Sequence, residues 1–281
     1  MQRLNKFGKI FLAVIALMIS AIGVSAATFT VTDTNDSGAG SLRQAIIDAN
    51  ATAGTDIINF DANFNVSRTI TLTSGEMLMT NGGGITINGP GRNLLTVSGN
   101  NQTRAFEINS YNQAITVVVN NLTISNCAVL TLGVGDGVSI DINRDGNTST
   151  QAFSVTDLTL NNAAITNTTV SNSGFYSINS RAAGDITINN SYIGNNNAAV
   201  LGTNVGGFAA NIAARRVTIS NSTIERNFGN NGLISNGGEN LIVTNSTIND
   251  NTVNNNGSAF RLTVVTGASF NLTNSTVVRN C

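Results

Sequence analysis

One polar stretch of the chain has the residue types and the spacing of a calcium-binding loop. The segment Asp141-Ile142-Asn143-Arg144-Asp145-Gly146 fits the first half of a pattern in which carboxylate and amide oxygens surround Ca²⁺. Asp136 lies close by, but Ala152 occupies the twelfth position, where a bidentate carboxylate belongs. The competing interpretation is a polar turn between two strands. The sequence therefore predicts no cofactor apart from a candidate Ca²⁺ site at Asp141, Asn143 and Asp145.

The other reactive side chains do not suggest a catalytic centre. The chain has no His, no Trp, three Tyr and no two adjacent Asp residues. Hydrolysis of a polysaccharide uses two carboxyl groups, one as acid and one as base. We therefore expect a protein without enzymatic activity, and an enzyme that cleaves acidic polysaccharide remains the alternative. Three or more carboxylates that converge with an arginine on one face would favour the enzyme.

The elements that must position these residues form a repeat. Six segments follow the pattern apolar-x-apolar-x-Asn-x-x-apolar, and their Asn residues are 36, 28, 31, 24 and 29 residues apart. The segments are Leu122–Val129, Leu158–Ile165, Ile186–Ile193, Val217–Ile224, Leu241–Ile248 and Phe270–Val277. The Asn residues at the fixed position are Asn126, Asn162, Asn190, Asn221, Asn245 and Asn274. A constant motif at irregular spacing is typical of a solenoid whose coils keep their core strands and vary their loops.

The motif has a direct physical interpretation. Alternating apolar residues direct one face of a strand into a core. Asn tolerates the left-handed backbone of a sharp corner, and stacked coils would align the six Asn amides in a hydrogen-bonded ladder. The sequence thus predicts an all-β fold, a right-handed parallel β-helix. An antiparallel sandwich or a propeller is less favoured, because most Asn-Gly pairs fall in the variable stretches and not at a fixed place in the motif.

The N-terminal part differs from the repeat and predicts a cap. Residues 27–60 fit a strand, a helix at 41–50 and a second strand. Ser41 and Gln44 match a capping box, and Leu42 belongs to one apolar stripe of the helix. Such a helix suits the lid that an open solenoid end needs. We interpret Arg43 as structural, pairing with a carboxylate or capping carbonyl groups, and not as a catalytic base.

Residues Phe29–Asn50 resemble the N-terminal CSLREA cap of secreted bacterial β-helix proteins, which have pectate-lyase-like solenoids. The Ser-Leu-Arg-Glu-Ala core of that cap appears here as Ser41-Leu42-Arg43-Gln44-Ala45. The resemblance is specific over residues 28–110 and implies a parallel β-helix, in a group whose members mostly have no established activity. The lyase motif Arg-x-Pro-x-x-Arg is not matched around Pro90, the single proline.

The first 26 residues resemble an export signal. Arg3, Lys6 and Lys9 precede an uncharged apolar run from Ile10 to Val24, and Val24-Ser25-Ala26 fits a signal-peptidase site. The alternative is an uncleaved anchor, although the run is shorter than the roughly 20 residues that span a bilayer. We expect cleavage after Ala26, secretion to the medium or the cell surface, and no transmembrane segment afterwards.

The charge balance restricts the partners. Without the three basic residues of the signal, 11 of the 14 basic residues remain against 15 acidic ones, so the net charge is −4. Such a surface does not attract a phosphate backbone, and we expect no nucleic-acid partner. The expected partners are extracellular polysaccharide or molecules on a host or cell surface. The expected function is adhesion, surface structure or glycan and matrix binding by a monomeric solenoid.

Two remaining features concern the cysteines and the extent of the chain. Cys127 and Cys281 would lie several coils apart, too far for a disulfide. We expect a signal peptide at 1–26, the cap at 27–60 and coils at 61–281 that continue beyond residue 281, because the last motif is not followed by a capping element.

Overall fold

The fold was described from a computed structural model, which places eleven stretches of the chain. The described residues are 26–109, 113–129, 137–142, 156–170, 176–180, 184–203, 215–229, 233–236, 239–253, 259–262 and 267–281. The predicted signal segment before Ala26 and the candidate calcium ligands Asn143 and Asp145 lie outside them. Within these stretches, no helix is long and apolar enough to cross a membrane.

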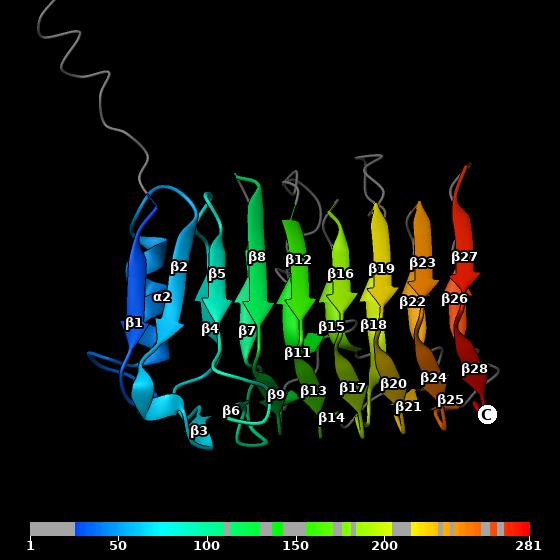
Figure 1. The fold of residues 1–281 in the computed structure, drawn as a ribbon, viewed down its shortest axis with the longest axis horizontal. Coiled ribbons are helices and arrows are strands. Elements are labelled where there is room, and N and C mark those ends of the chain that lie inside the picture. The colour runs from blue at the N-terminus through cyan, green and yellow to red at the C-terminus, as the bar shows by residue number, and fades with distance from the viewer. Residues whose placement is uncertain are drawn as a thin grey trace, which may run out of the picture.

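Three long sheets contain most of the described strands, and their strands run side by side along the molecule (Figure 1). Sheet A contains β1 (Thr28–Val31), β2 (Asp56–Phe60), β5 (Ile85–Asn88), β8 (Ile115–Asn120), β12 (Thr156–Asn161), β16 (Ile186–Asn189), β19 (Arg216–Ser220), β23 (Asn240–Thr244) and β27 (Ser269–Thr273). Sheet B contains β3 (Arg68–Thr71), β6 (Leu95–Ser98), β9 (Thr123–Ser125), β13 (Ala164–Thr166), β17 (Tyr192–Gly194), β20 (Thr223–Glu225), β24 (Thr247–Asn249) and β28 (Thr276–Val278).

The third face is shorter. Sheet C contains β4 (Met77–Met79), β7 (Phe106–Ile108), β11 (Gly137–Ile142), β15 (Tyr176–Ser180), β18 (Ala199–Thr203), β22 (Ile234–Asn236) and β26 (Phe260–Leu262). Two small pairs complete the described strands: β10 (Ala128–Val129) with β14 (Thr169–Val170), and β21 (Phe228–Gly229) with β25 (Thr252–Val253). All pairings among the described strands are parallel.

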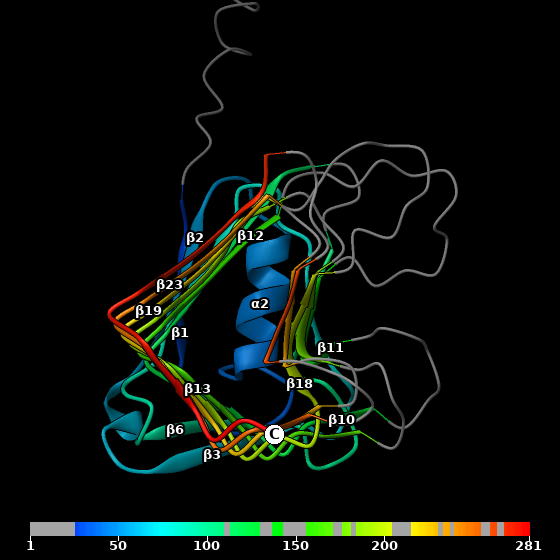
Figure 2. The same cartoon turned by 90° about the vertical axis from the view of Figure 1, so that its right-hand side faces the viewer.

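Each coil passes from sheet A to sheet B and then to sheet C, which gives the roughly triangular cross-section of Figure 2. Figure 2 views the solenoid from its C-terminal end, and the chain circulates anticlockwise while it advances toward the viewer. The coil is therefore right-handed. The predicted all-β, right-handed parallel β-helix with one short capping helix is confirmed.

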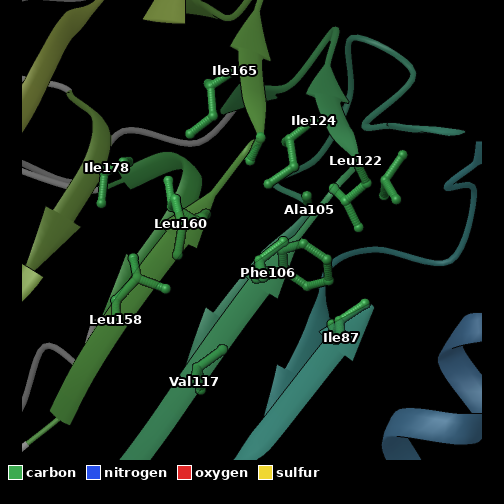
Figure 3. Close-up of a cluster of buried hydrophobic side chains, with 14 of the residues drawn as sticks. Ile87, Ala105, Phe106, Val117, Leu122, Ile124, Leu158, Leu160, Ile165 and Ile178 are labelled. Atoms are coloured by element: carbon green, nitrogen blue, oxygen red, sulfur yellow. The ribbon is translucent and has the colours of Figure 1, made fainter. Parts of the chain in front are cut away.

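The core is a column of aliphatic side chains that the period-two pattern directs inward. Ile87, Val119 and Leu160 stack in register on neighbouring strands of sheet A, and all three are buried. Ile124 and Ile165 stack in the same way on sheet B, and Phe106 enters from sheet C (Figure 3). Parallel stacking of like residues thus buries apolar surface that one coil alone could not bury.

Two of the corners of each coil use a left-handed backbone in six successive coils. The corner between sheets A and B has residues with φ of 48° to 58°, at Asn121, Asn162, Asn190, Asn221, Asn245 and Asn274. The corner after sheet B has φ of 49° to 58°, at Asn126, Asn167, Asn195, Arg226, Asp250 and Arg279. Asn adopts this conformation more readily than other residues with a side chain, which explains why it recurs at both places.

The two corners correct one part of the predicted repeat. Asn126 does not stack with Asn162, because Ile124 pairs with Ile165 and Val119 pairs with Leu160. The residue that stacks with Asn162 is Asn121, whose Oδ1 accepts a hydrogen bond from Nδ2 of Asn162 at 2.8 Å. In this coil the motif matched the second corner, at Asn126, and not the first, at Asn121. Both corners combine an Asn with nearby apolar residues, and the two Asn residues lie five positions apart.

The N-terminal end of the solenoid is closed by a helix. Helix α2 (Leu42–Asn50) lies within the triangle of Figure 2, and its residues Leu42, Ala45, Ile46 and Ala49 are buried. The short 3₁₀ helix η1 (Ala62–Phe64) follows β2. Nδ2 of Asn50 donates to the carbonyl of Leu78 at 2.7 Å, and its Oδ1 accepts from the N–H of Thr80 at 2.8 Å. The Asn50 amide thus satisfies the free edge of β4 as a neighbouring strand would.

The last coil has no such cover within the described residues. Phe270 and Leu272 stack on the buried Leu241 and Val243, yet they remain 43% and 42% exposed.

Candidate functional site

Charged side chains gather on the outer face of sheet C, near its N-terminal end. Glu107 on β7 and Asp141 on β11 are register partners. Glu76 precedes β4 and Arg104 precedes β7, and the neighbouring strands bring both to the same region. Three carboxylates and one arginine therefore lie on one face, although they come from three separate coils.

The geometry of this cluster is that of an ion-pair network. Nη1 of Arg104 donates to Oε2 of Glu76 at 3.1 Å, and its Nε lies 3.8 Å from Oδ2 of Asp141. Arg104 is 4% exposed, Asp141 0% and Glu107 8%. Two like charges on adjacent strands repel each other, and the guanidinium offsets that repulsion. Arg104, Asp141 and Glu107 are buried and come from neighbouring coils, so their contacts can hold the coils together, but a substrate reaches them poorly.

Of the three candidate calcium ligands, Asp141 lies among the described residues. Asp141 lies in β11, and its carboxylate faces Arg104. No group of three or more acidic, His or Cys side chains in the described stretches is placed to hold a metal ion. The described residues therefore do not form a calcium site by themselves, and a cation at Asp141 would have to lie beside the Arg104 guanidinium.

The cap residues form a structural cluster. Ser41 is the N-cap of α2, and its Oγ accepts from the N–H of Gln44 at 3.1 Å. The side chain of Gln44 turns away to Asp48 at 2.8 Å, so the second half of a capping box is not formed. Leu42 is fully buried in the end of the core.

Arg43 joins the helix to the loop before β4. Its guanidinium donates to the carbonyl groups of Gly75 and Glu76 at 2.6 and 2.8 Å, and to Oδ1 of Asp36 at 2.7 Å. Burial raises the pKa of Asp36, but hydrogen bonds from Arg43, Ser74 and Thr73 outweigh it and lower that pKa to about 2. All these contacts are internal, and because they stabilise the charged guanidinium they oppose its acting as a base.

The Asn residues at the first corner form an interrupted ladder, which is tight between Asn162 and Asn121 and looser and more exposed farther along. Asn190 donates to Asn162, and Asn245 donates to Asn221, each at 3.4 Å. The tighter ladder at this corner belongs to serines: the N–H of Ser191 donates to Oγ of Ser222 at 3.0 Å, and the N–H of Ser222 donates to Oγ of Ser246 at 3.2 Å. The recurrent Asn-Ser-Thr triplet thus supplies a corner, a ladder hydroxyl and an outward strand residue.

A second, buried Asn ladder lies just after the other corner. Asn196, Asn227 and Asn251 are at most 1% exposed. Nδ2 of Asn196 donates to Oδ1 of Asn227 at 2.9 Å, and Nδ2 of Asn227 donates to Oδ1 of Asn251 at 2.9 Å. The sequence signals these residues by their constant spacing, six positions after the first corner, but it does not reveal their burial.

The outer face of sheet A carries a further column of stacked amides. Asn88 donates to Asn59, Asn120 to Asn88, and Asn161 to Asn120, at 3.0, 2.9 and 3.0 Å. Each amide has two donors and two lone pairs, so one bond to each neighbour leaves capacity for a ligand or water. The column is polar, uncharged and partly exposed.

One residue on the outer face of sheet B was missed by the sequence reasoning. Tyr192 occupies an outward position at which the coils on either side have Ala164 and Thr223. Its hydroxyl group donates to Oε1 of Glu225 at 3.1 Å and accepts from Nδ2 of Asn195 at 3.3 Å. The signal that could have found it is the departure from the Thr of the repeat.

Neither cysteine forms a disulfide; Cys127 is buried and Cys281 is exposed. Burial raises the pKa of the Cys127 thiol to about 12. A thiol that is both inaccessible and protonated is chemically inert.

Comparison with known proteins adds a structural likeness. No protein-family model and no curated protein matches the sequence. Among solved structures, the chain is similar to that of Jun a 1, the major allergen from cedar pollen, at 15% identity and a TM-score of 0.39. The similarity covers 88% of this chain and 79% of that one. The parallel ladders themselves establish the architecture: the chain is an all-β parallel β-helix solenoid.

Proposed function

We propose that this protein is an exported, non-catalytic β-solenoid that binds extracellular glycan or matrix polymers through its polar outer faces. The observation that carries the proposal is the column of stacked amides from Asn59 to Asn161 on sheet A. A row of identical polar groups offers the same hydrogen bonds on four successive coils, at the coil spacing of about 4.8 Å. A polymer of repeating sugar units presents hydrogen-bonding groups in the same periodic manner.

The charges of the chain favour this proposal over a catalytic one. In the charged cluster of sheet C, Arg104 lies between Glu76 and Asp141 and offsets part of their negative charge. A general acid or base must reach a substrate atom within hydrogen-bond distance, which burial of Asp141 and Glu107 opposes. The export signal at 1–26 and the net charge of −4 after its removal suit an extracellular protein that avoids nucleic acid.

The proposal is tested by sedimenting the secreted full chain with insoluble cellulose, chitin and cross-linked polygalacturonate. We expect the protein to bind at least one of these polymers, and the supernatant to contain no released sugar. The proposal fails if the protein binds none of them, or if the polymer it binds is cleaved.

A second candidate function is cleavage of acidic polysaccharide, and the convergence of Glu76, Glu107 and Asp141 with Arg104 favours it. Such an enzyme would release unsaturated or reducing ends from polygalacturonate in the presence of Ca²⁺. Activity that is lost in both Asp141→Asn and Arg104→Gln, with the fold intact by circular dichroism, would support it. Asp157→Asn, on sheet A, is the matched control for removing one carboxylate.

A further inference from the structure

One outward column of sheet B has Thr at every coil but two, which have Ala164 and Tyr192. The register places one residue of each coil in this column: Thr69, Thr96, Thr123, Ala164, Tyr192, Thr223, Thr247 and Thr276. Thr suits an exposed strand position, and the repeat uses it in six of these eight coils. Where a sequence departs from its own local rule, a functional site is the usual reason.

The departure involves two positions, because a glycine accompanies the tyrosine. Gly194 occupies the next outward position of β17, where the neighbouring coils have Thr166 and Glu225. Gly inside a strand lowers its stability and often marks a close approach by another group. Here the approaching group is the ring of Tyr192 itself.

The hydroxyl end of the ring lies over Gly194. A Cβ atom added to Gly194 would lie 2.8 Å from Cε1 of Tyr192, and nearer still to Cζ and the hydroxyl oxygen. If the added Cβ atom lay in the plane of the ring at these distances from Cζ and the hydroxyl oxygen, it would be much closer than 2.8 Å to one of the two Cε atoms. The added atom would therefore meet a face of the ring. One face of the ring, at its hydroxyl end, covers Gly194, and the Tyr192 side chain remains partly exposed.

The ring is also fixed at its far end. Its hydroxyl group bonds to Glu225 on the next coil and to Asn195 at the corner. Burial and the Glu225 carboxylate raise the pKa of Tyr192, so the hydroxyl group remains a donor. A ring that is already oriented loses little conformational freedom when a ligand binds.

We propose that Tyr192 is a stacking platform for one neutral, β-linked pyranose unit of a polysaccharide, an inference that rests on the proposed function. The C–H groups on the apolar face of a pyranose are weakly positive, and they match the negative face of the aromatic ring. Asn195 and Thr223 lie at the rim of the ring, where equatorial hydroxyl groups of the sugar would meet them.

The surrounding charges select a neutral sugar. Glu225 bonds to the Tyr192 hydroxyl group, Arg226 and Arg279 pair with Glu225 and Asp250, and Arg92 donates to the carbonyl group of Asn190. An acidic sugar would therefore meet the Glu225 carboxylate at the platform, and a neutral sugar avoids that repulsion.

A purely structural role for the Tyr192–Gly194 pair predicts a different outcome. If the ring only covers a weak point of the strand, removing it will lower stability and leave sugar binding unchanged. Tyr192→Thr restores the residue of the column and removes the platform, whereas Tyr192→Phe keeps the ring and removes its hydroxyl group. Thr247→Ala changes the same column two coils away and is the matched control.

The probe is cellohexaose, titrated into the full chain by calorimetry, with hexagalacturonate as the acidic comparison. We expect Tyr192→Thr to weaken cellohexaose binding at least about tenfold, and Tyr192→Phe and Thr247→Ala to stay within about threefold of the wild type. Thermal unfolding of each variant reports stability independently. Equal binding by Tyr192→Thr and the wild type, or tighter binding of hexagalacturonate, would overturn the inference.

A failure of this inference is distinguishable from a failure of the proposed function. If the wild-type chain sediments with a polysaccharide but Tyr192→Thr sediments equally well, the solenoid binds glycan elsewhere and only the platform is wrong. If the wild-type chain binds no polymer, both proposals fail together.

Discussion

The buried side chain of Asn227 donates to Oδ1 of Asn251 at 2.9 Å, and the backbone N–H of Asn227 donates to the same oxygen at 2.9 Å. Nδ2 of Asn227 also donates to the carbonyl of Ile193 at 3.0 Å, and its Oδ1 accepts from Asn196. One buried amide thus satisfies polar groups of three consecutive coils. This arrangement makes the buried ladder, and not the exposed one, the main polar determinant of coil stacking.

We predict that Asn227→Ala destabilises the protein by about 2–4 kcal/mol, because it leaves several buried polar groups without partners. Equilibrium unfolding in urea measures the loss. Asn221→Gly is the matched control at the other corner, since Gly accepts its φ of 51° and its amide is exposed. The control should cost less than about 1 kcal/mol. Equal costs for the two variants would contradict the distinction between the ladders.

Asp36 should make the cap sensitive to acid. Its pKa is lowered from 3.8 to about 2 in the folded chain, so the charged form is favoured by folding. The stabilisation is therefore complete above pH 3.8 and is lost as the pH falls through 2. We expect Asp36→Asn to be less stable than the wild type at neutral pH and to show a smaller fall in stability between these pH values.

Acid titration of the unfolding midpoint, followed by helix circular dichroism, measures this component. Arg43→Gln removes the main hydrogen-bonding partner of Asp36 and should reduce the same component. A wild-type pH profile in both variants would mean that the Arg43–Asp36 pair does not couple folding to pH.

The two thiols should differ sharply in reactivity. Cys281 is exposed, whereas the Cys127 thiol is buried and its pKa is raised to about 12. We expect an alkylating reagent to modify one thiol in the native chain and both after denaturation, as counted by mass spectrometry. Cys281→Ser should leave no reactive thiol in the native chain. Rapid native modification of Cys127 would show that the core opens at this coil.

The candidate sites were predictable to different degrees. The alternation in Ile186–Ile193 and its relatives predicted inward strands, and the polar pattern of Ser41–Asn50 predicted the helix that closes the end. The convergence of Glu76, Arg104 and Asp141 was not predictable, because these residues are far apart in sequence and meet only through the stacking of β4, β7 and β11. The same holds for Tyr192 and Glu225, which lie on successive coils.

Local patterning by itself determined the kind of coil: strands with one apolar face, Asn corners, and an amphipathic lid at one end. These features depend on residues within a few positions of one another, so backbone preference and side-chain alternation encode them directly. Only the tertiary structure decided which residues stack, as the displacement of Asn126 by Asn121 shows. The register of stacking is fixed between coils whose connections vary in length. Burial then determines which of the many similar Asn residues stabilise the fold.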